Sequence, residues 1–427
     1  MVLYEKHQLD NGLTVLTHEA WDTPLASVNL LYNVGSRDEA PGRTGFAHLF
    51  EHLMFGGTPE VPNFDAVVSS VGGEDNAFTT CDYTNYYMTL PVDALPTALM
   101  LEADRMAHLD ISPRALEVQQ HVVTEEYNQR YMNQPYGDIW LLLRPLCYKV
   151  HPYRWPTIGA DIRHVSEATL DDVRDFHSRF YRPDNAILAI AAPLKHSEMQ
   201  QMVEEAWGSR LSRDSRLLSS ESVSSCTSSL YPAEPEQREA RLLRVQREVP
   251  ASMVYLAYPM GDRFSGHFRT CDLISDVLGN GPSSRLHRHL VVEQGMMTEA
   301  DACISGEAGP GLLILSGKLR EGVTLDEAAD ALRHEARQLA LPLGDDCAER
   351  EYELQKVQNK YENTFVFSQY KASDRALSLC HYTWVGDTEL VNREPEEYRR
   401  VTAGQLQETA AALFVPHHEN LLYYEKI

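Results

Sequence analysis

The sequence predicts an α+β protein built from two copies of one unit, each a sheet packed with helices. Stretches of alternating, β-branched residues, which indicate strands, are interspersed with stretches whose apolar residues recur at helical spacing. Residues 24–32 resemble residues 250–258, and residues 180–188 resemble residues 413–422. Because the two strand matches occur at nearly the same offset, they indicate an internal duplication.

A change in composition separates the two copies. Residues 217–237 are rich in serine and contain two prolines, a composition that is typical of a linker. We therefore assign residues 1–216 to an N-terminal domain and residues 238–427 to a homologous C-terminal domain. Only the N-terminal domain contains a His-x-x-Glu-His motif. A chain of 427 residues is long enough for two such cores.

The elements of the first copy follow from local patterns. Residues 3–17 predict a hairpin, in which Asn11 and Gly12 supply the tight turn. Residues 135–156, rich in aromatic residues and prolines, are expected to wrap the core without forming one regular element. The remaining patterns predict strands over residues 27–34, 76–80, 83–90 and 185–192, and helices around residues 46–54 and over residues 63–70, 95–108, 113–131, 170–179 and 197–207.

Charge and cysteine usage exclude some classes of function. The formal net charge of −24 argues against nucleic acid as the main partner, because phosphates need neutralising cations. Seven scattered cysteines without a Cys-x-x-Cys pair favour a reducing compartment. The sequence shows no signal peptide and no apolar stretch long enough to span a bilayer. We therefore expect a cytoplasmic protein without a membrane partner, or a periplasmic one if an export signal has been removed.

The motif that carries chemistry is His48-Leu49-Phe50-Glu51-His52. Histidines at positions i and i+4 share one face of a helix, and neutral imidazoles are good zinc ligands. Glu51 lies at the edge of that face, where a carboxylate can take a proton from water. The alternative is a pair of core histidines. It is less favoured, because two imidazoles and a carboxylate are costly to bury unless a metal pairs with them.

A catalytic zinc takes three protein ligands and keeps one position open. The third ligand is expected on another buried element, and the helix over residues 113–131 offers Glu125. Glu126 and His121 are the alternatives. Glu125 is preferred because it stacks one turn after His121, whereas Glu126 points about 100° away and is expected to face solvent or a partner.

These motifs together resemble the insulinase, pitrilysin and mitochondrial-processing-peptidase family of inverted zincins. The resemblance runs over essentially the whole chain and rests on residues 48–57, 72–73, 76–80, 83–87, 122–126 and 283–286. It implies one Zn²⁺ per chain, held by His48, His52 and Glu125, with Glu51 as the general base. It also implies two homologous domains with mixed or antiparallel sheets, which together form one half of a clam-shell chamber.

The resemblance further implies a zinc-dependent endopeptidase that cleaves short or unfolded peptides. In this family the peptide adds as a strand to a sheet edge beside the zinc, and that edge corresponds here to Asn76, Ala77 and Phe78. A non-catalytic scaffold or a peptide-binding subunit of the same fold is the alternative.

The resemblance also implies a second family subunit, because the short form of the family completes its chamber by dimerising. The opposing half usually supplies an arginine and a tyrosine that fix the substrate and the developing oxyanion. Val291 and Thr298 hold those places here. A heterodimer is therefore favoured over a homodimer.

Overall fold

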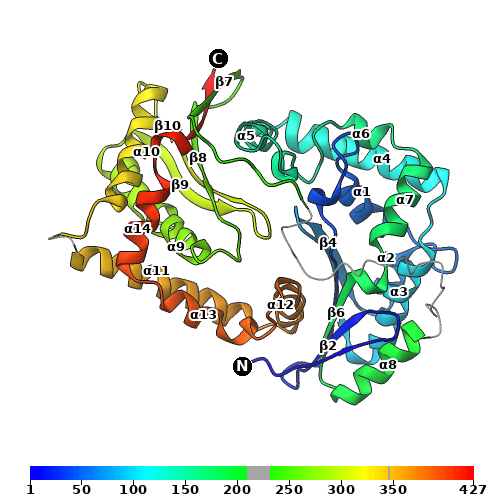
Figure 1. Cartoon of the computed structure of the whole chain (residues 1–427). Coiled ribbons are helices and arrows are strands. Elements are labelled where there is room, and N and C mark those ends of the chain that lie inside the picture. Colours follow the sequence, from blue (N-terminus) through cyan, green and yellow to red (C-terminus); the bar gives the residue numbers. More distant parts are fainter. Residues whose placement is uncertain (209–230, 345–346) are drawn as a thin grey trace. The chain divides into compact units, whose positions relative to one another are not determined.

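The computed structural model describes residues 1–208, 231–344 and 347–427. These residues form two compact units, each with one sheet and its own helices (Figure 1). The first unit comprises Met1–Gln129, the described part of Trp155–Thr227, and Val366–Arg393. The second comprises Arg130–Arg154, the described part of Ser228–Phe365, and Glu394–Ile427. The predicted linker over residues 217–237 lies outside the described residues up to residue 230.

The first sheet has six strands in the order β1-β2-β6-β3-β5-β4. Its neighbouring strands are antiparallel except for the parallel pair β2 and β6. The first two strands form the predicted hairpin, with Gly12 at a φ of +94° in its turn. The strands are β1 (Glu5–Gln8), β2 (Thr14–Glu19), β3 (Leu25–Tyr32), β4 (Glu74–Thr79), β5 (Thr84–Pro91) and β6 (Ala186–Ala192).

The second sheet repeats the first without an equivalent of β1. Its order is β7-β11-β8-β10-β9, and only β7 and β11 are parallel among its described pairs. Strands β3 and β8 hold equivalent places, as do β6 and β11, so the two sequence matches mark a duplicated unit as predicted. The strands are β7 (Arg241–Arg247), β8 (Met253–Met260), β9 (Met297–Ser305), β10 (Gly311–Leu319) and β11 (Asn420–Lys426).

Some helices of the first unit begin where the sequence supplies a side-chain cap. Ser112 accepts a hydrogen bond from the backbone N–H of Ala115 at the start of α4, and Thr169 and Asp172 form a capping box at the start of α7. The helices are α1 (Phe46–Leu53), α2 (Phe64–Ser70), α3 (Leu95–His108), α4 (Pro113–Tyr127), α6 (Arg163–Ser166), α7 (Leu170–Phe180), α8 (His196–Gly208) and α12 (Ala372–Val385).

The second unit packs its helices on a core that draws on both the sheet and the helices. Leu256, Leu273 and Leu332 are 0% exposed in that core, one from a strand and two from helices. The helices that contribute to this unit are α5 (Ile139–Cys147), α9 (Phe268–Gly279), α10 (Leu325–Ala340), α11 (Cys347–Ser368), α13 (Leu390–Arg399) and α14 (Ala403–Leu413).

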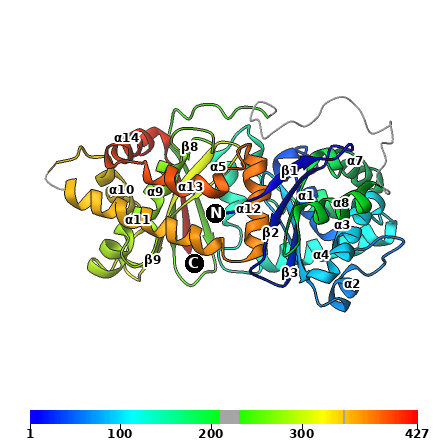
Figure 2. The same cartoon turned by 90° about the horizontal axis from the view of Figure 1, so that it is seen from below.

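Two helices belong to the unit formed mainly by the other half of the chain. Helix α5 packs on β7, β8 and β11 of the second sheet, and α12 packs on β3 and β6 of the first, where Figure 2 shows it in orange beside the blue strands. The predicted boundaries at residues 216 and 238 follow the order of the chain and do not include this exchange. Residues 135–156 do not form one regular element, as expected, but they include α5, in which Pro145 lies inside the helix and supplies no N–H for an intrahelical hydrogen bond.

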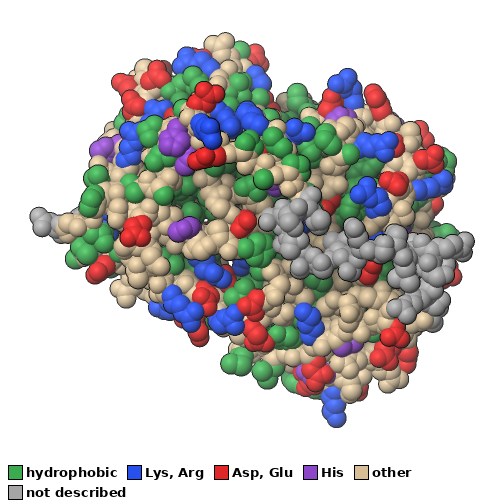
Figure 3. All heavy atoms as spheres, in the orientation of Figure 1, with side chains coloured by type: hydrophobic (Ala, Val, Ile, Leu, Met, Phe, Trp, Pro, Cys, Tyr) green, Lys and Arg blue, Asp and Glu red, His purple; other side chains and the backbone are tan. Residues whose placement is uncertain are grey.

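The surface carries charges of both signs. On the face shown in Figure 3, acidic and basic side chains are interspersed. The whole chain carries a formal net charge of −24.

None of the helices in the described part of the chain combines the length and the hydropathy that crossing a bilayer requires.

Candidate metal centre

Helix α1 places His48 and His52 on one face, as the spacing predicts. Their ring centroids lie 4.8 Å apart and the ring planes are nearly perpendicular, at 83°. His48 is buried and His52 is partly exposed. The helix begins after Gly45, whose φ of +89° favours glycine, and a Cβ at this position would lie 2.7 Å from the carbonyl oxygen of Ile158. Glycine therefore allows the first turn of α1 to pack closely against residues 158–165.

Helix α4 brings the carboxylate of Glu126 to the two histidines. Glu126 Oε2 lies 3.1 Å from His52 Nε2 and 3.6 Å from His48 Nε2. One ligand atom from each residue lies within 4.8 Å of the others, and the described chain contains no other such group of three metal-ligating side chains. Tetrahedral zinc with nitrogen and oxygen ligands separates its ligand atoms by about 3.3 Å. The two measured distances lie on either side of that value, so these residues fit a zinc ion.

The geometry brings Glu126, and not the predicted Glu125, to the two histidines. Glu125 is exposed and shares a face of α4 with Val118 and Val122, which are 49% and 43% exposed. Glu126 follows Val123, which is 0% exposed, by three residues and therefore lies on the buried side. Of these three valines, the structure therefore buries only Val123. His121, the other alternative, is also exposed.

Glu51 is tied to the edge strand of the first sheet. The hydroxyl of Thr79, at the end of β4, donates a hydrogen bond of 2.5 Å to Glu51 Oε2. Glu51 itself is partly exposed, so it is accessible to a water molecule. The sequence reasoning did not single out Thr79, although its place at the end of the predicted edge strand was a usable signal.

The three predicted edge residues all lie on β4. In register with β5, Asn76 is opposite Tyr87, Ala77 is opposite Tyr86, and Phe78 is opposite Asn85. Among the described strands, β4 pairs only with β5, which leaves its other edge available for main-chain pairing. This strand also packs against α1. The structure therefore places the predicted edge beside the helix that carries the histidines.

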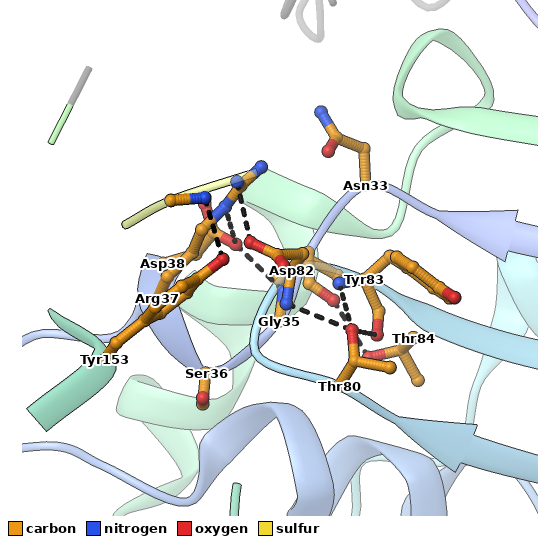
Figure 4. A network of polar contacts seen from close by, with 12 residues as sticks. Asn33, Gly35, Ser36, Arg37, Asp38, Thr80, Asp82, Tyr83, Thr84 and Tyr153 are labelled. Atoms are coloured by element: carbon orange, nitrogen blue, oxygen red, sulfur yellow. Dashed lines mark hydrogen bonds and ion pairs between the residues drawn. The ribbon is translucent and has the colours of Figure 1, made fainter. Parts of the chain in front are cut away.

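The turn between β4 and β5 is held by polar contacts from the loop after β3 (Figure 4). Arg37 donates a buried hydrogen bond of 2.8 Å to Asp82. The Oγ1 atom of Thr80 accepts hydrogen bonds from the backbone N–H groups of Asp82 and Tyr83, at 3.0 and 2.9 Å. A Cβ at Gly35 would lie 2.4 Å from the carbonyl oxygen of Cys81, so only glycine fits there without movement. These contacts fix the turn from which β4 is positioned.

Aromatic side chains support α1 from the side of α7. The rings of Phe50 and Phe176 stack with centroids 5.3 Å apart, and Phe50 also stacks on His177 at 5.9 Å. Burial lowers the pKa of His177 to about 4, so its imidazole is neutral at pH 7. His177 therefore adds packing near α1 rather than positive charge.

The second unit has different chemistry at the equivalent helices. Helix α9, which takes the place of α1, carries no histidine. Arg285 donates hydrogen bonds of 2.6 to 3.0 Å to both carboxylate oxygens of Glu353 on α11. Val291 is partly buried, and Thr298 is exposed and donates to the carbonyl of Lys318 at 3.3 Å.

Family models match both halves of the chain. Residues 14–138 match the model described as insulinase, peptidase family M16, and residues 167–346 match the model described as peptidase M16 inactive domain. The first match lies within the N-terminal half, whereas the second begins in that half and extends into the C-terminal half. The first of these segments contains all the residues of the candidate metal centre.

The curated relatives include proteins named zinc proteases. The zinc protease PqqE of Helicobacter pylori is 30% identical over 301 residues, which cover 70% of this chain and 66% of that protein. The chain thus spans just under two thirds of that relative's length. An uncharacterized zinc protease of Mycobacterium leprae is 30% identical over 358 residues, which cover 82% of this chain and 75% of that protein.

A solved structure shares the fold over the full length. The crystal structure of a protease from Helicobacter pylori superposes with a TM-score of 0.90 at 24% identity and covers 100% of both chains. Together with the two family models and the relative from Mycobacterium leprae, this likeness places the fold and the sequence in one family. The chain belongs to the insulinase family, peptidase family M16.

Proposed function

We propose that the chain is a zinc-dependent endopeptidase that cleaves short or unfolded peptides. The observation that carries this proposal is the convergence of His48, His52 and Glu126 at separations suited to tetrahedral zinc, with Glu51 on the same helix. The names of the relatives support the same chemistry, because they are called zinc proteases.

Each residue of the cluster has a role in this proposal. His48, His52 and Glu126 hold one zinc ion per chain. Zinc, when bound, lowers the pKa of water and polarises a carbonyl group. Glu51 takes the proton of the attacking water and returns it to the leaving amine. The hydroxyl of Thr79 orients the Glu51 carboxylate through its 2.5 Å hydrogen bond.

The peptide substrate is proposed to pair with β4 along Asn76, Ala77 and Phe78. Its main chain would add a strand to the edge of the first sheet, next to α1. Main-chain hydrogen bonds do not depend on the side chains of the peptide, so this mode of binding accepts varied sequences.

A second family subunit is proposed to complete the site. Val291 has no hydrogen-bonding side chain, and the single hydroxyl of Thr298 donates to a backbone carbonyl of its own sheet. Neither residue can stabilise a developing oxyanion as an arginine or a tyrosine would. We therefore favour a heterodimer in which the partner supplies these groups, with the two chains enclosing the peptide. Co-purification followed by mass spectrometry identifies the partner.

The test combines metal content with peptide cleavage. The purified protein, with its partner if one co-purifies, is expected to contain one zinc ion per chain and to cleave unstructured fluorogenic peptides. The control is Glu51→Gln, which should keep its zinc but lose about 10²- to 10⁴-fold in cleavage rate. Full activity of this variant would refute Glu51 as the base. A protein that binds no zinc and cleaves no peptide would instead favour the non-catalytic alternative.

A further inference from the structure

Glu39 lies at the start of α1 although it is six residues before the helix N-cap. Its two carboxylate oxygens accept hydrogen bonds from the backbone N–H groups of Gly45 and Ala47, each at 2.9 Å. The side chain is almost completely buried, since Glu39 is 5% exposed. Both oxygens of this buried carboxylate are therefore engaged with the first turn of the helix that carries the histidines.

Helix α1 requires an external acceptor at this end. The first N–H groups of any helix have no partner within the helix, and the N-cap residue, Gly45, has no side chain to accept from them. The close packing of this turn against residues 158–165 limits access of water to these groups. Burial raises the pKa of Glu39, whereas the hydrogen bonds from Ala47 and Gly45 lower it, and the partial positive charge at the helix N-terminus favours an oxygen acceptor here.

The position of His48 makes this cap relevant to the metal centre. Helix α1 has only eight residues, with His48 in its first turn and His52 in its last. Short helices fray from their ends. Loss of the cap would therefore displace His48 more than His52, and the two imidazoles would no longer converge with Glu126.

The loop that contains Glu39 also holds the edge strand. Two residues earlier, Arg37 binds Asp82 in the turn between β4 and β5, and Asp38 accepts a hydrogen bond of 2.8 Å from the backbone of Gly35 (Figure 4). The short segment from Arg37 to Glu39 thus contacts both helix α1 and the turn of the hairpin that contains β4. The contacts of this segment therefore fix the position of α1 relative to the hairpin of β4 and β5.

We infer that Glu39 is a positioning residue of the metal centre, which holds the first turn of α1 so that His48 faces His52 and Glu126. The inference rests on the proposed function only in assuming that the cluster binds zinc. Partners that orient metal ligands typically contribute 10- to 100-fold to metal affinity, which gives the size of the expected effect.

The test is the zinc affinity of Glu39→Gln in the full chain, measured by competition with a chromophoric chelator. Glutamine keeps the size of the side chain but presents an NH₂ group to one of the two N–H donors. We expect zinc to bind about 10- to 100-fold more weakly, and the absorption spectrum of the Co²⁺-substituted site to change. Circular dichroism establishes that the variant is folded.

The matched control is Glu327→Gln in the second unit. Glu327 caps α10 by accepting a hydrogen bond of 2.9 Å from the backbone of Thr324, but this helix carries no proposed ligand. Its zinc affinity should stay within about twofold of wild type. If Glu39→Gln does not fold, Glu39→Asp, which withdraws the carboxylate by one methylene, is measured in its place with the same expected weakening.

Two outcomes separate this inference from the proposed function. A folded Glu39 variant with the zinc affinity and Co²⁺ spectrum of wild type would overturn the positioning role and leave the metal centre intact. A wild-type protein that binds no zinc would overturn the proposed function itself, and this inference with it.

Discussion

The two units share a topology but use it differently. Both sheets have the same order of five equivalent strands and the same single parallel pair, and α1 and α9 occupy equivalent places. In the first unit the neighbouring helices bring two histidines and a carboxylate together. In the second, α9 has no histidine and Glu353 on α11 binds Arg285. The fold therefore supplies a scaffold, and a few side chains decide whether it can hold a metal.

The largest expected effect is a loss of stability on substitution of Glu353, a carboxylate of the second unit that binds Arg285 and lies outside the candidate metal centre. Glu353→Gln removes one partner of an ion pair whose side chains are about 10% exposed, and leaves Arg285 without its charge partner. We expect a loss of about 3 kcal/mol in the free energy of unfolding of the second unit. Denaturant unfolding measures it. Zinc affinity should not change, and a weaker zinc site in this variant would show that the units are not chemically independent.

A second prediction uses pH to separate the units. Burial lowers the pKa of His177 in the first unit from 6.5 to about 4, and raises that of Asp272 in the second from 3.8 to about 6. The folded state disfavours charged His177, so this contribution to stability is present above pH 6.5 and lost as the pH falls towards 4. The folded state favours protonated Asp272. The contribution of this group to stability is therefore present below pH 4 and is lost as the pH rises through 6.

Variants at these two positions separate the two opposite dependences of stability on pH. Between pH 4.5 and 7, His177→Phe should remove an acid destabilisation of about 1–2 kcal/mol, and Asp272→Asn should remove a stabilisation of similar size on acidification. Thermal unfolding across this pH range measures both. Unaltered pH dependence in either variant would mean that the group does not titrate as its burial implies.

The smallest effect concerns the orientation of Glu51. Thr79→Val keeps the shape of the side chain but removes the hydroxyl that donates to Glu51 Oε2. A hydrogen bond to a charged group contributes about 1.5 kcal/mol or more, so kcat should fall about tenfold with KM and zinc affinity little changed. Thr79→Ser, which retains the hydroxyl, is the control and should keep most of the activity. A fall in Thr79→Ser equal to that in Thr79→Val would point to packing instead.

Much of the fold could be predicted, because the local periodicity of apolar residues indicates its strands and helices. The hairpin around Gly12, the matched strands β3 and β8, and the helix with His48 and His52 all follow from patterns within a few residues. Which helix packs on which sheet does not follow from such local patterns. Neither α5 nor α12 was predicted as a helix, and no local pattern indicates that each packs on the sheet formed mainly by the other half of the chain.

The carboxylate proposed as the third zinc ligand also could not be identified from local patterns. The choice between Glu125 and Glu126 depends on which side of α4 is buried, and the position of Glu125 one turn after His121 does not determine that side. Leu116 and Val123, which are 4% and 0% exposed, mark the buried side. Glu39 was beyond the reach of local patterns, because its contact with α1 depends on how the intervening loop folds back.

The most direct test of the central claim compares two adjacent carboxylates on α4. Glu126→Gln removes a proposed zinc ligand, whereas Glu125→Gln changes an exposed neighbour on the same turn by the same atoms. We predict that Glu126→Gln weakens zinc binding at least about 100-fold, beyond the range typical of residues that only orient ligands, and that Glu125→Gln leaves it within about twofold. Intact zinc affinity in Glu126→Gln, or its loss in Glu125→Gln instead, would contradict the metal centre described here.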